Sequence, residues 1–191
     1  MKTAVWTLEK PFACVRPAGV MALGSLFFAV LTALGGAVSF PLPFSPVPIT
    51  LQTFFSVLAG VVLGPVWGPV SQVLYLGAGL VGMPVFAGGT AGLGVLAGPT
   101  GGYLVGFVAG AWLAGWLAAP GASWFRLAGA LLAGHAAVFV CGVSHLLLFT
   151  GQSVETALLL GFFPFLPGTA LKVMGALALA RSRTLCGWFR S

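Results

Sequence analysis

The chain has 191 residues, of which 59 % are hydrophobic and only 5 % are charged, and its mean hydropathy is +1.10. A soluble domain carries about 25 % charged residues. This composition therefore excludes a soluble protein and predicts an exterior that faces lipid. The net charge of +6 indicates orientation in a bilayer rather than nucleic-acid binding, because the basic residues flank apolar stretches. The scattered Cys14, Cys141 and Cys186 indicate neither a disulfide framework nor a metal site.

Apolar stretches separated by proline and glycine predict an all-α integral membrane protein, a compact bundle of six transmembrane helices in one domain, 1–191. A helix needs about 20 apolar residues to cross a hydrocarbon core of about 30 Å. The second and third stretches are shorter than that. Proline excludes helix from the segment FPLPFSPVPITLQT after the first stretch, and Gly64-Pro65 and Pro120-Gly121 mark further breaks. The expected spans are 18–39, 51–63, 66–81, 102–119, 127–149 and 168–180.

The segment 83–100, MPVFAGGTAGLGVLAGPT, is apolar but rich in glycine, and it fits neither a helix nor a strand. Irregular backbone at such a position is tolerated where protein buries it or where it lines a cavity. We therefore expect a glycine-rich capping or re-entrant loop between spans three and four, and a candidate site. Its GLGVLA matches a dinucleotide-binding pattern but follows no strand and precedes no suitably spaced acid, so we reject nucleotide binding.

Basic residues give the orientation of the bundle. With six spans, all those outside the spans fall on one side of the membrane, which the positive-inside rule makes cytoplasmic. Both termini are then expected in the cytoplasm. The residues concerned are Lys2, Lys10, Arg16, Arg126, Arg181, Arg183 and Arg190.

Lys172 is the most informative single residue, because it lies inside the sixth span with no acid near it in sequence. A lysine at the centre of a membrane helix costs about 2.5–3.5 kcal/mol on insertion scales. It either serves a function or extends its ammonium group to the interface. An ammonium group facing a cavity suits an anionic ligand such as a carboxylate. The chain has no Asp or Asn and only Glu9 and Glu155 as acids, which argues against ion-coupled transport.

Uncharged polar side chains cluster near the three loops on the opposite side from the termini. Such groups can hold an amide-like or urea-like ligand by hydrogen bonds, while Phe86 offers apolar surface. Each could equally serve helix packing. His135 and His145 are too far apart for one metal ion and are expected to bond to neighbouring helices. The polar candidates are Gln52, Gln72, Tyr75, Thr100, Tyr103 and Thr169.

Small residues repeat at four-residue spacing on two spans, which lets membrane helices approach closely. Gly102, Gly106 and Gly110 lie on the fourth span, and Ala29 and Ala33 lie on the first. These residues are expected either to pack within the bundle or to form a docking face for another membrane protein.

Three motifs make the chain similar to one known family. They are PLPFSPVPITLQT at 41–53, GMPVFAGG followed by GPTGGYLVGF within 82–107, and FPFLPGTALK at 163–172. On these motifs the chain resembles the BioY family, the biotin-specific substrate-binding (S) components of energy-coupling-factor (ECF) transporters. The resemblance covers nearly the whole chain.

The resemblance implies six helices with biotin held beneath the loops on the outer side, in a multi-pass protein of the bacterial plasma membrane. The sequence shows no nucleophile–base–acid set or metal cluster, so we expect neither enzymatic activity nor a cofactor. Its partners would be biotin, membrane lipid, a transmembrane coupling protein and cytoplasmic ATPase subunits that alone handle ATP, with no nucleic acid. The AxxxA pairs Ala29/Ala33 and Ala18/Ala22 match the kind of face that meets the coupling protein.

One position departs from the family pattern. The family has PGDLLK in the sixth span, whereas this chain has PGTALK, so Thr169 replaces an acid and Lys172 remains. A threonine hydroxyl is a weaker acceptor than a carboxylate, which predicts weaker biotin binding by roughly 1–2 kcal/mol. The biotin carboxylate is expected at Lys172, although the ureido end could lie there instead. The alternatives are a related vitamin or biotin precursor as ligand, and a non-transporting membrane scaffold.

Overall fold

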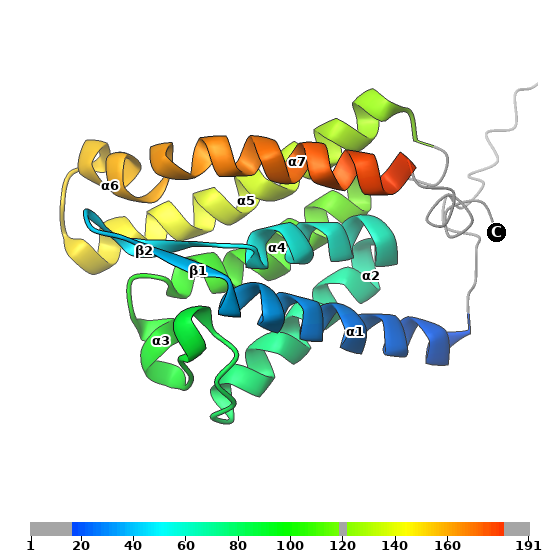
Figure 1. Ribbon diagram of the computed structural model, residues 1–191, viewed down its shortest axis with the longest axis horizontal. Coiled ribbons are helices and arrows are strands. Elements are labelled where there is room, and N and C mark those ends of the chain that lie inside the picture. The colour runs from blue at the N-terminus through cyan, green and yellow to red at the C-terminus, as the bar shows by residue number, and fades with distance from the viewer. Residues whose placement is uncertain (1–16, 119–121, 182–191) are drawn as a thin grey trace, which may run out of the picture.

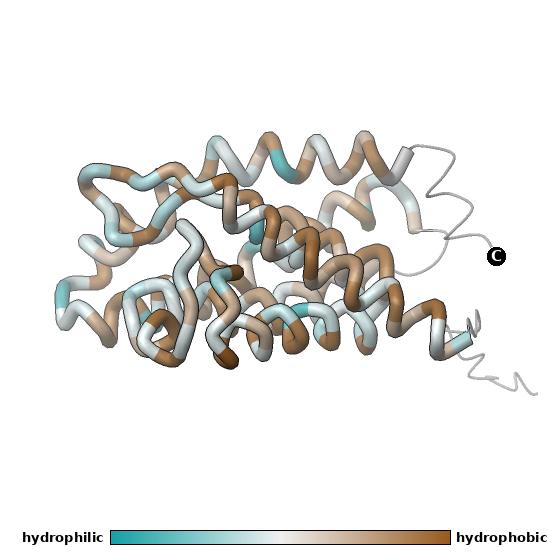
Figure 2. The backbone as a smooth tube through the Cα atoms, turned by 60° about the horizontal axis from the view of Figure 1, so that its bottom comes forward, coloured by the Kyte–Doolittle hydropathy of each residue, from teal (hydrophilic) through white to brown (hydrophobic). Residues whose placement is uncertain are grey.

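The computed structural model describes residues 17–118 and 122–181, and it is a bundle of long apolar helices (Figure 1). Figure 2 shows how little of the tube is hydrophilic along these helices. Most of the basic residues that predict the orientation, and two of the three cysteines, lie outside the described residues. They are residues 2, 10, 14, 16, 183, 186 and 190. The long helices are α1 (Ala18–Ala37), α2 (Gln52–Leu80), α4 (Gly101–Leu117), α5 (Trp124–Thr150) and α7 (Leu166–Arg181).

Helix α2 is two antiparallel membrane helices joined at Gly64, which has φ 82° and ψ −176°. Glycine reaches this backbone region without the steric cost that a Cβ would add. The Gln52 side chain donates a hydrogen bond to the Tyr75 hydroxyl at 2.5 Å. In one continuous helix these residues would lie about 35 Å apart at 1.5 Å per residue. The contact therefore shows that α2 folds back on itself.

Glycines allow the two halves of α2 and helix α4 to pack at backbone distance. A Cβ on Gly68 would lie 2.6 Å from the Cα atom of Gly60, and one on Gly60 would overlap the carbonyl oxygen of Ala111. A Cβ on Gly115 would lie 2.6 Å from the carbonyl carbon of Gly64. Close approach of this kind maximises van der Waals contact where no hydrophobic driving force acts between helices.

The three glycines of α4 predicted from their spacing lie against α5. Gly102 faces Cys141 and His145, and Gly106 and Gly110 face the backbone around Val138 and Gly134. All three are buried, so they serve packing within the bundle.

Counting the two halves of α2 separately, six apolar helices run along the bundle, and they confirm the expected helical membrane fold. Their bounds lie within a few residues of the expected spans. By length and composition alone, α1, the whole of α2, α5 and the α6–α7 stretch are long enough to cross a membrane, and α4 is shorter. The start of α1 and the end of α7 lie at the same end of the bundle, as an even number of spans requires (Figure 1).

The proline-rich segment forms a two-stranded antiparallel ribbon, β1 (Ser39–Leu42) and β2 (Ser45–Thr50), which the sequence reading treated only as a break between helices. Ser39 pairs with Thr50 and Leu42 with Ser45, with an irregularity between. Proline is acceptable here because each strand of a two-stranded ribbon has a free edge that needs no donor. The ribbon lies across the end of the bundle opposite the start of α1 (Figure 1).

The remaining short elements lie at the same end as the ribbon. The expected glycine-rich capping loop contains the 3-10 turn η1 (Ala87–Gly89) and the short helix α3 (Leu93–Ala97). Helix α6 (Val154–Gly161), which the sequence reading missed, leads through η2 (Phe163–Phe165) into α7. His145 ties the loop to α5 by a 3.0 Å hydrogen bond between its Nε2 atom and the carbonyl oxygen of Gly98.

Candidate ligand-binding site

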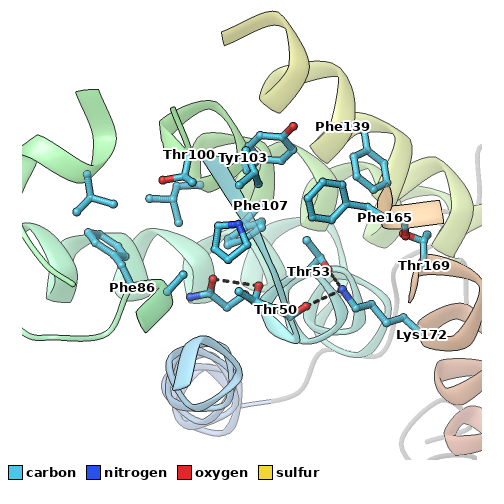
Figure 3. A pocket seen from close by; sticks show the side chains of 16 residues that line it. Thr50, Thr53, Phe86, Thr100, Tyr103, Phe107, Phe139, Phe165, Thr169 and Lys172 are labelled. Carbon is cyan, nitrogen blue, oxygen red and sulfur yellow. Dashed lines mark hydrogen bonds between the residues drawn. The ribbon is translucent and has the colours of Figure 1, made fainter. Parts of the chain in front are cut away.

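A cavity lies where the ribbon, the capping loop and the start of α7 meet. It contains about 560 Å³ of space not filled by atoms, its open mouth included. Side chains from α2, α4, α5 and α7 point toward it (Figure 3). Its lining consists of Val47, Pro48, Thr50, Gln52, Thr53, Phe86, Ala87, Val95, Thr100, Tyr103, Leu104, Phe107, Phe139, Phe165, Thr169 and Lys172.

Lys172 brings a positive charge to the cavity wall. Its Nζ atom donates hydrogen bonds of 2.6 Å to the carbonyl oxygen of Thr50 and to the hydroxyl of Thr53 (Figure 3). Both acceptors are neutral, and none of the lining residues is acidic. The side chain is thus held inward against α2, which disfavours the alternative that it extends to the membrane surface.

Thr169 lies one turn before Lys172 and is 8 % exposed. Its hydroxyl donates to the carbonyl oxygen of Phe165 at 2.9 Å. A hydroxyl has one donor and two acceptor positions, so this bond leaves its lone pairs to accept a hydrogen bond from a ligand N–H group.

Gln52 joins three elements around the cavity. Its Nε2 atom donates to the Tyr75 hydroxyl and lies 3.5 Å from the carbonyl oxygen of Val85 in the capping loop. Its Oε1 atom accepts from the Thr50 hydroxyl at 3.3 Å. Because Thr50 also binds Lys172 through its carbonyl, a continuous hydrogen-bonded chain runs from α7 through the end of the ribbon to the capping loop. Such a chain fixes the direction of each polar group before ligand arrives.

Aromatic rings form about half of the apolar wall. Phe86 comes from the capping loop and lies 1 % exposed, with its ring edge-to-face against Tyr75 at 5.6 Å between centroids. Phe139 of α5 and Phe165 of η2 form the wall near Thr169 (Figure 3). The Tyr103 hydroxyl donates to the carbonyl oxygen of Gly161 at 2.8 Å, which ties α4 to the end of α6.

The structure gathers six of the eight ligand-binding candidates around this one cavity. Gln72 and Tyr75 do not line it. Tyr75 supports Gln52 from behind, while Gln72 is fully buried and bonds to Thr32 of α1 and to its neighbour Ser71. The six lining candidates are Gln52, Phe86, Thr100, Tyr103, Thr169 and Lys172.

The sequence reading missed the two partners of Lys172, Thr50 and Thr53, and the rings Phe107, Phe139 and Phe165. The threonines flank Gln52 in the motif PITLQT. Their position next to a predicted ligand-binding residue could have indicated that they lie near the site. Phe139 carried none, because a phenylalanine in an apolar helix has the same pattern whether it meets a ligand or another helix.

The two candidate docking alanines differ from one another in exposure. Ala29 is only 6 % exposed and lies within the core, and Ala33 is half-buried against it. Ala29 therefore packs inside the bundle and presents no surface to a partner. The second AxxxA pair of the same helix, Ala18 and Ala22, is exposed.

The histidines bond to backbone carbonyls, His135 to Leu131 at 2.9 Å and His145 to Gly98. Across residues 17–118 and 122–181 no group of three potential metal-ligating side chains occurs.

The fold and the cavity together define a helical membrane protein that can enclose a small molecule at one end of its bundle. The chain belongs to the BioY family, whose profile matches residues 13–186. It is 39 % identical over 155 residues to the "Biotin transporter BioY" of Thermotoga maritima, covering 80 % of this chain and 89 % of that protein. It is 33 % identical over 173 residues to the "Biotin transporter BioY" of Rhizobium etli, covering 85 % and 91 %.

A solved structure supports the same family. The chain superimposes with a TM-score of 0.79 on the crystal structure of the S-component for biotin from an ECF-type ABC transporter. The match covers 91 % of this chain and 97 % of that one, at 28 % identity.

Proposed function

We propose that this protein binds biotin in the cavity and serves as the substrate-binding component of an ECF-type uptake system. The observation that carries the proposal is the cavity wall itself, which combines one cation, oriented uncharged polar groups and aromatic rings within a BioY-family fold. Biotin has the three matching parts: a carboxylate, a ureido group and an apolar ring with an aliphatic tail. The relatives named above as biotin transporters support the same ligand.

The ligand carboxylate meets Lys172 in this proposal. The ammonium group lies half-buried beside neutral acceptors only, and a charge-assisted hydrogen bond to a carboxylate is about twice as strong as a neutral one. The ureido group then lies toward Gln52 and Thr100, and the apolar ring lies against Phe86 and Phe107. In the reverse orientation the ureido oxygen accepts from Lys172 and a ureido N–H donates to Thr169.

Thr169 supports a second candidate ligand, a biotin precursor. A hydroxyl already bonded to Phe165 accepts one N–H group less strongly than a carboxylate would. Without a carboxylate at this position, a ligand with a complete ureido ring gains less binding free energy relative to molecules that lack that ring.

The partners in this proposal are a transmembrane coupling protein and cytoplasmic ATPases. The chain contains no P-loop pattern GxxxxGK[ST], so energy for uphill transport comes from outside it. We place the coupling contact on the exposed part of α1 that includes Ala18 and Ala22. The protein acts as a carrier of ligand rather than as an enzyme, in the cytoplasmic membrane with both termini inside.

The test is equilibrium binding of labelled biotin to the full chain purified in detergent, with desthiobiotin and thiamine as competitors. We expect saturable binding near one biotin per chain, displaced by desthiobiotin and not by thiamine. Stronger displacement by a diamine precursor that lacks the ureido carbonyl than by biotin would favour the precursor. Absence of saturable binding in folded protein would refute ligand binding and leave a scaffold role.

A further inference from the structure

The charges of the described residues around the cavity do not balance. Lys172 is half-buried and contributes one positive charge. Of the two acids in the sequence, Glu155 is exposed on α6, and Glu9 lies outside the described residues. None of the residues that line the cavity is acidic. A charge in such a place is costly unless an opposite charge is near it.

The hydrogen bonds of Lys172 do not remove this imbalance. An ammonium group has three N–H donors, and two of them are directed at Thr50 and Thr53 (Figure 3). Both acceptors are neutral dipoles, which orient the ammonium group without cancelling its charge. The third donor remains for a further acceptor. Thr53 accepts with its oxygen, so its hydroxyl hydrogen can donate to that same acceptor.

Two helix starts add to the positive potential. Gln52 and Thr53 open the first half of α2, and Thr100 and Tyr103 lie at the start of α4, and all four line the cavity. Helix N-termini carry partial positive charge. They reinforce the charge of Lys172 within one cavity.

We propose that, in the ligand-free protein, the cavity binds a small monovalent anion such as chloride beside Lys172 and Thr53. The anion balances the lysine charge and must leave when an organic anion enters. The site is therefore an anion-exchange site, in which one negative charge replaces another. The proposal concerns the ligand-free state, so it does not depend on the identity of the organic ligand.

The direct test is chloride-35 NMR line broadening with the full purified chain and no organic ligand. We expect the protein to broaden the chloride line and the excess broadening to saturate as the site fills. The effect should disappear in Lys172→Gln. The matched control is Arg126→Gln, which removes an exposed cation that bonds to Leu117 outside the cavity. That control should broaden chloride as the parent does. Equal broadening in Lys172→Gln and the parent would overturn the proposal.

A second variant guards against misfolding of Lys172→Gln. Thr169→Asp keeps the lysine but supplies a negative charge one helical turn away, and it should abolish chloride broadening as well. Retained broadening in a folded Thr169→Asp protein would count against an anion held by the unbalanced lysine.

Competition with biotin separates this proposal from the proposed function. Replacing sulfate by chloride at equal ionic strength should raise the apparent Kd for biotin roughly threefold or more, because chloride and the biotin carboxylate compete. Saturable chloride broadening without any biotin binding would support the anion site and reject the biotin assignment. Biotin binding that is insensitive to chloride, with no broadening, would do the reverse.

Discussion

The Nζ atom of Lys172 in the last helix lies 2.6 Å from the carbonyl oxygen of Thr50 at the end of the β-ribbon, 122 positions earlier in the chain. This contact joins the sixth span to the proline-rich segment and forms one side of the cavity. Thr50 also donates to Gln52 through its hydroxyl. A substitution at Lys172 should therefore alter the positions of the ribbon and of the capping loop.

Lys172→Ala should lower biotin affinity by about tenfold or more, because it removes the one cation among the described residues that line the cavity. Arg126→Ala, which removes an exposed cation at the other end of the bundle, should leave affinity unchanged. Titration calorimetry on both purified variants measures the difference. Unchanged affinity in Lys172→Ala would assign the lysine to holding Thr50 and Thr53 alone.

Thr169→Asp should strengthen biotin binding by about 1–2 kcal/mol when the ureido group lies beside Lys172 and Thr169, because a carboxylate accepts ligand N–H groups more strongly than the hydroxyl it replaces. With the biotin carboxylate at Lys172, the added negative charge should weaken binding. Thr169→Val, which keeps the shape and removes the hydroxyl, should weaken binding. Parallel binding isotherms of the two variants decide the matter. Stronger binding by Thr169→Asp assigns the ureido group to this position, and weaker binding assigns the carboxylate to Lys172. Equal binding contradicts a ligand contact at this position.

Tyr75→Phe should reduce biotin affinity although Tyr75 does not line the cavity. The hydroxyl that it loses holds the Nε2 atom of Gln52, so the amide is free to turn away from the ligand. The buried amide also loses a partner, which costs about 1–3 kcal/mol of stability. Dissociation rates and thermal melting should both be measured. A Tyr75→Phe protein that melts earlier but binds normally would limit the residue to a structural role.

Gly79→Ala should displace the capping loop, because the added methyl group would overlap the ring of Phe86. Phe86 forms part of the cavity wall, so biotin affinity should fall about tenfold or more. Gly77→Ala is the matched control on the same helix, since a Cβ there meets nothing within 4 Å. If both variants bind biotin equally, the position of Phe86 has no influence on the site.

Gly60→Ala should destabilise the bundle by about 1–3 kcal/mol, the usual range for overpacking, because its methyl group would overlap the backbone of Ala111 in α4. Gly129→Ala on α5 serves as control, because a Cβ there meets nothing within 4 Å. Thermal denaturation in detergent compares them. Matching melting temperatures would show that α4 can shift away from α2 at little cost.

The six helices were predictable because hydropathy and helix breakers report directly on burial in lipid. Gly64-Pro65 marks a chain reversal that length alone hides, since the helix of 29 residues bounded by Gln52 and Leu80 is long enough to be taken for one tilted span. The β-ribbon was not predicted, because four prolines in ten residues argue against most regular structure and only pairing across the segment reveals it.

The sequence singles out residues whose chemistry is unusual for their surroundings, and the structure brings several of them to one cavity. Lys172, Thr169 and Gln52 are polar groups in apolar stretches, and all three line the cavity. Gln72 is also a polar group in an apolar stretch, but it bonds to Thr32 across a helix interface and does not line the cavity. A polar residue in a membrane helix needs a partner in either case, so only the three-dimensional arrangement distinguishes a ligand contact from a packing contact.

The ribbon is also bonded to α6, because the Ser45 hydroxyl donates to the carbonyl oxygen of Leu160 at 2.7 Å. Together with the contact between Thr50 and Lys172, this means that elements from both halves of the chain enclose the cavity. During synthesis the first half emerges from the ribosome well before α6 and α7. The acceptor oxygens of Thr50 and Thr53 are therefore already inserted when the lysine of the last span reaches the membrane. A nascent chain that stops before α7 contains every earlier span but lacks the part of the cavity wall that carries Lys172. Only a fully synthesised protein can therefore bind the ligand.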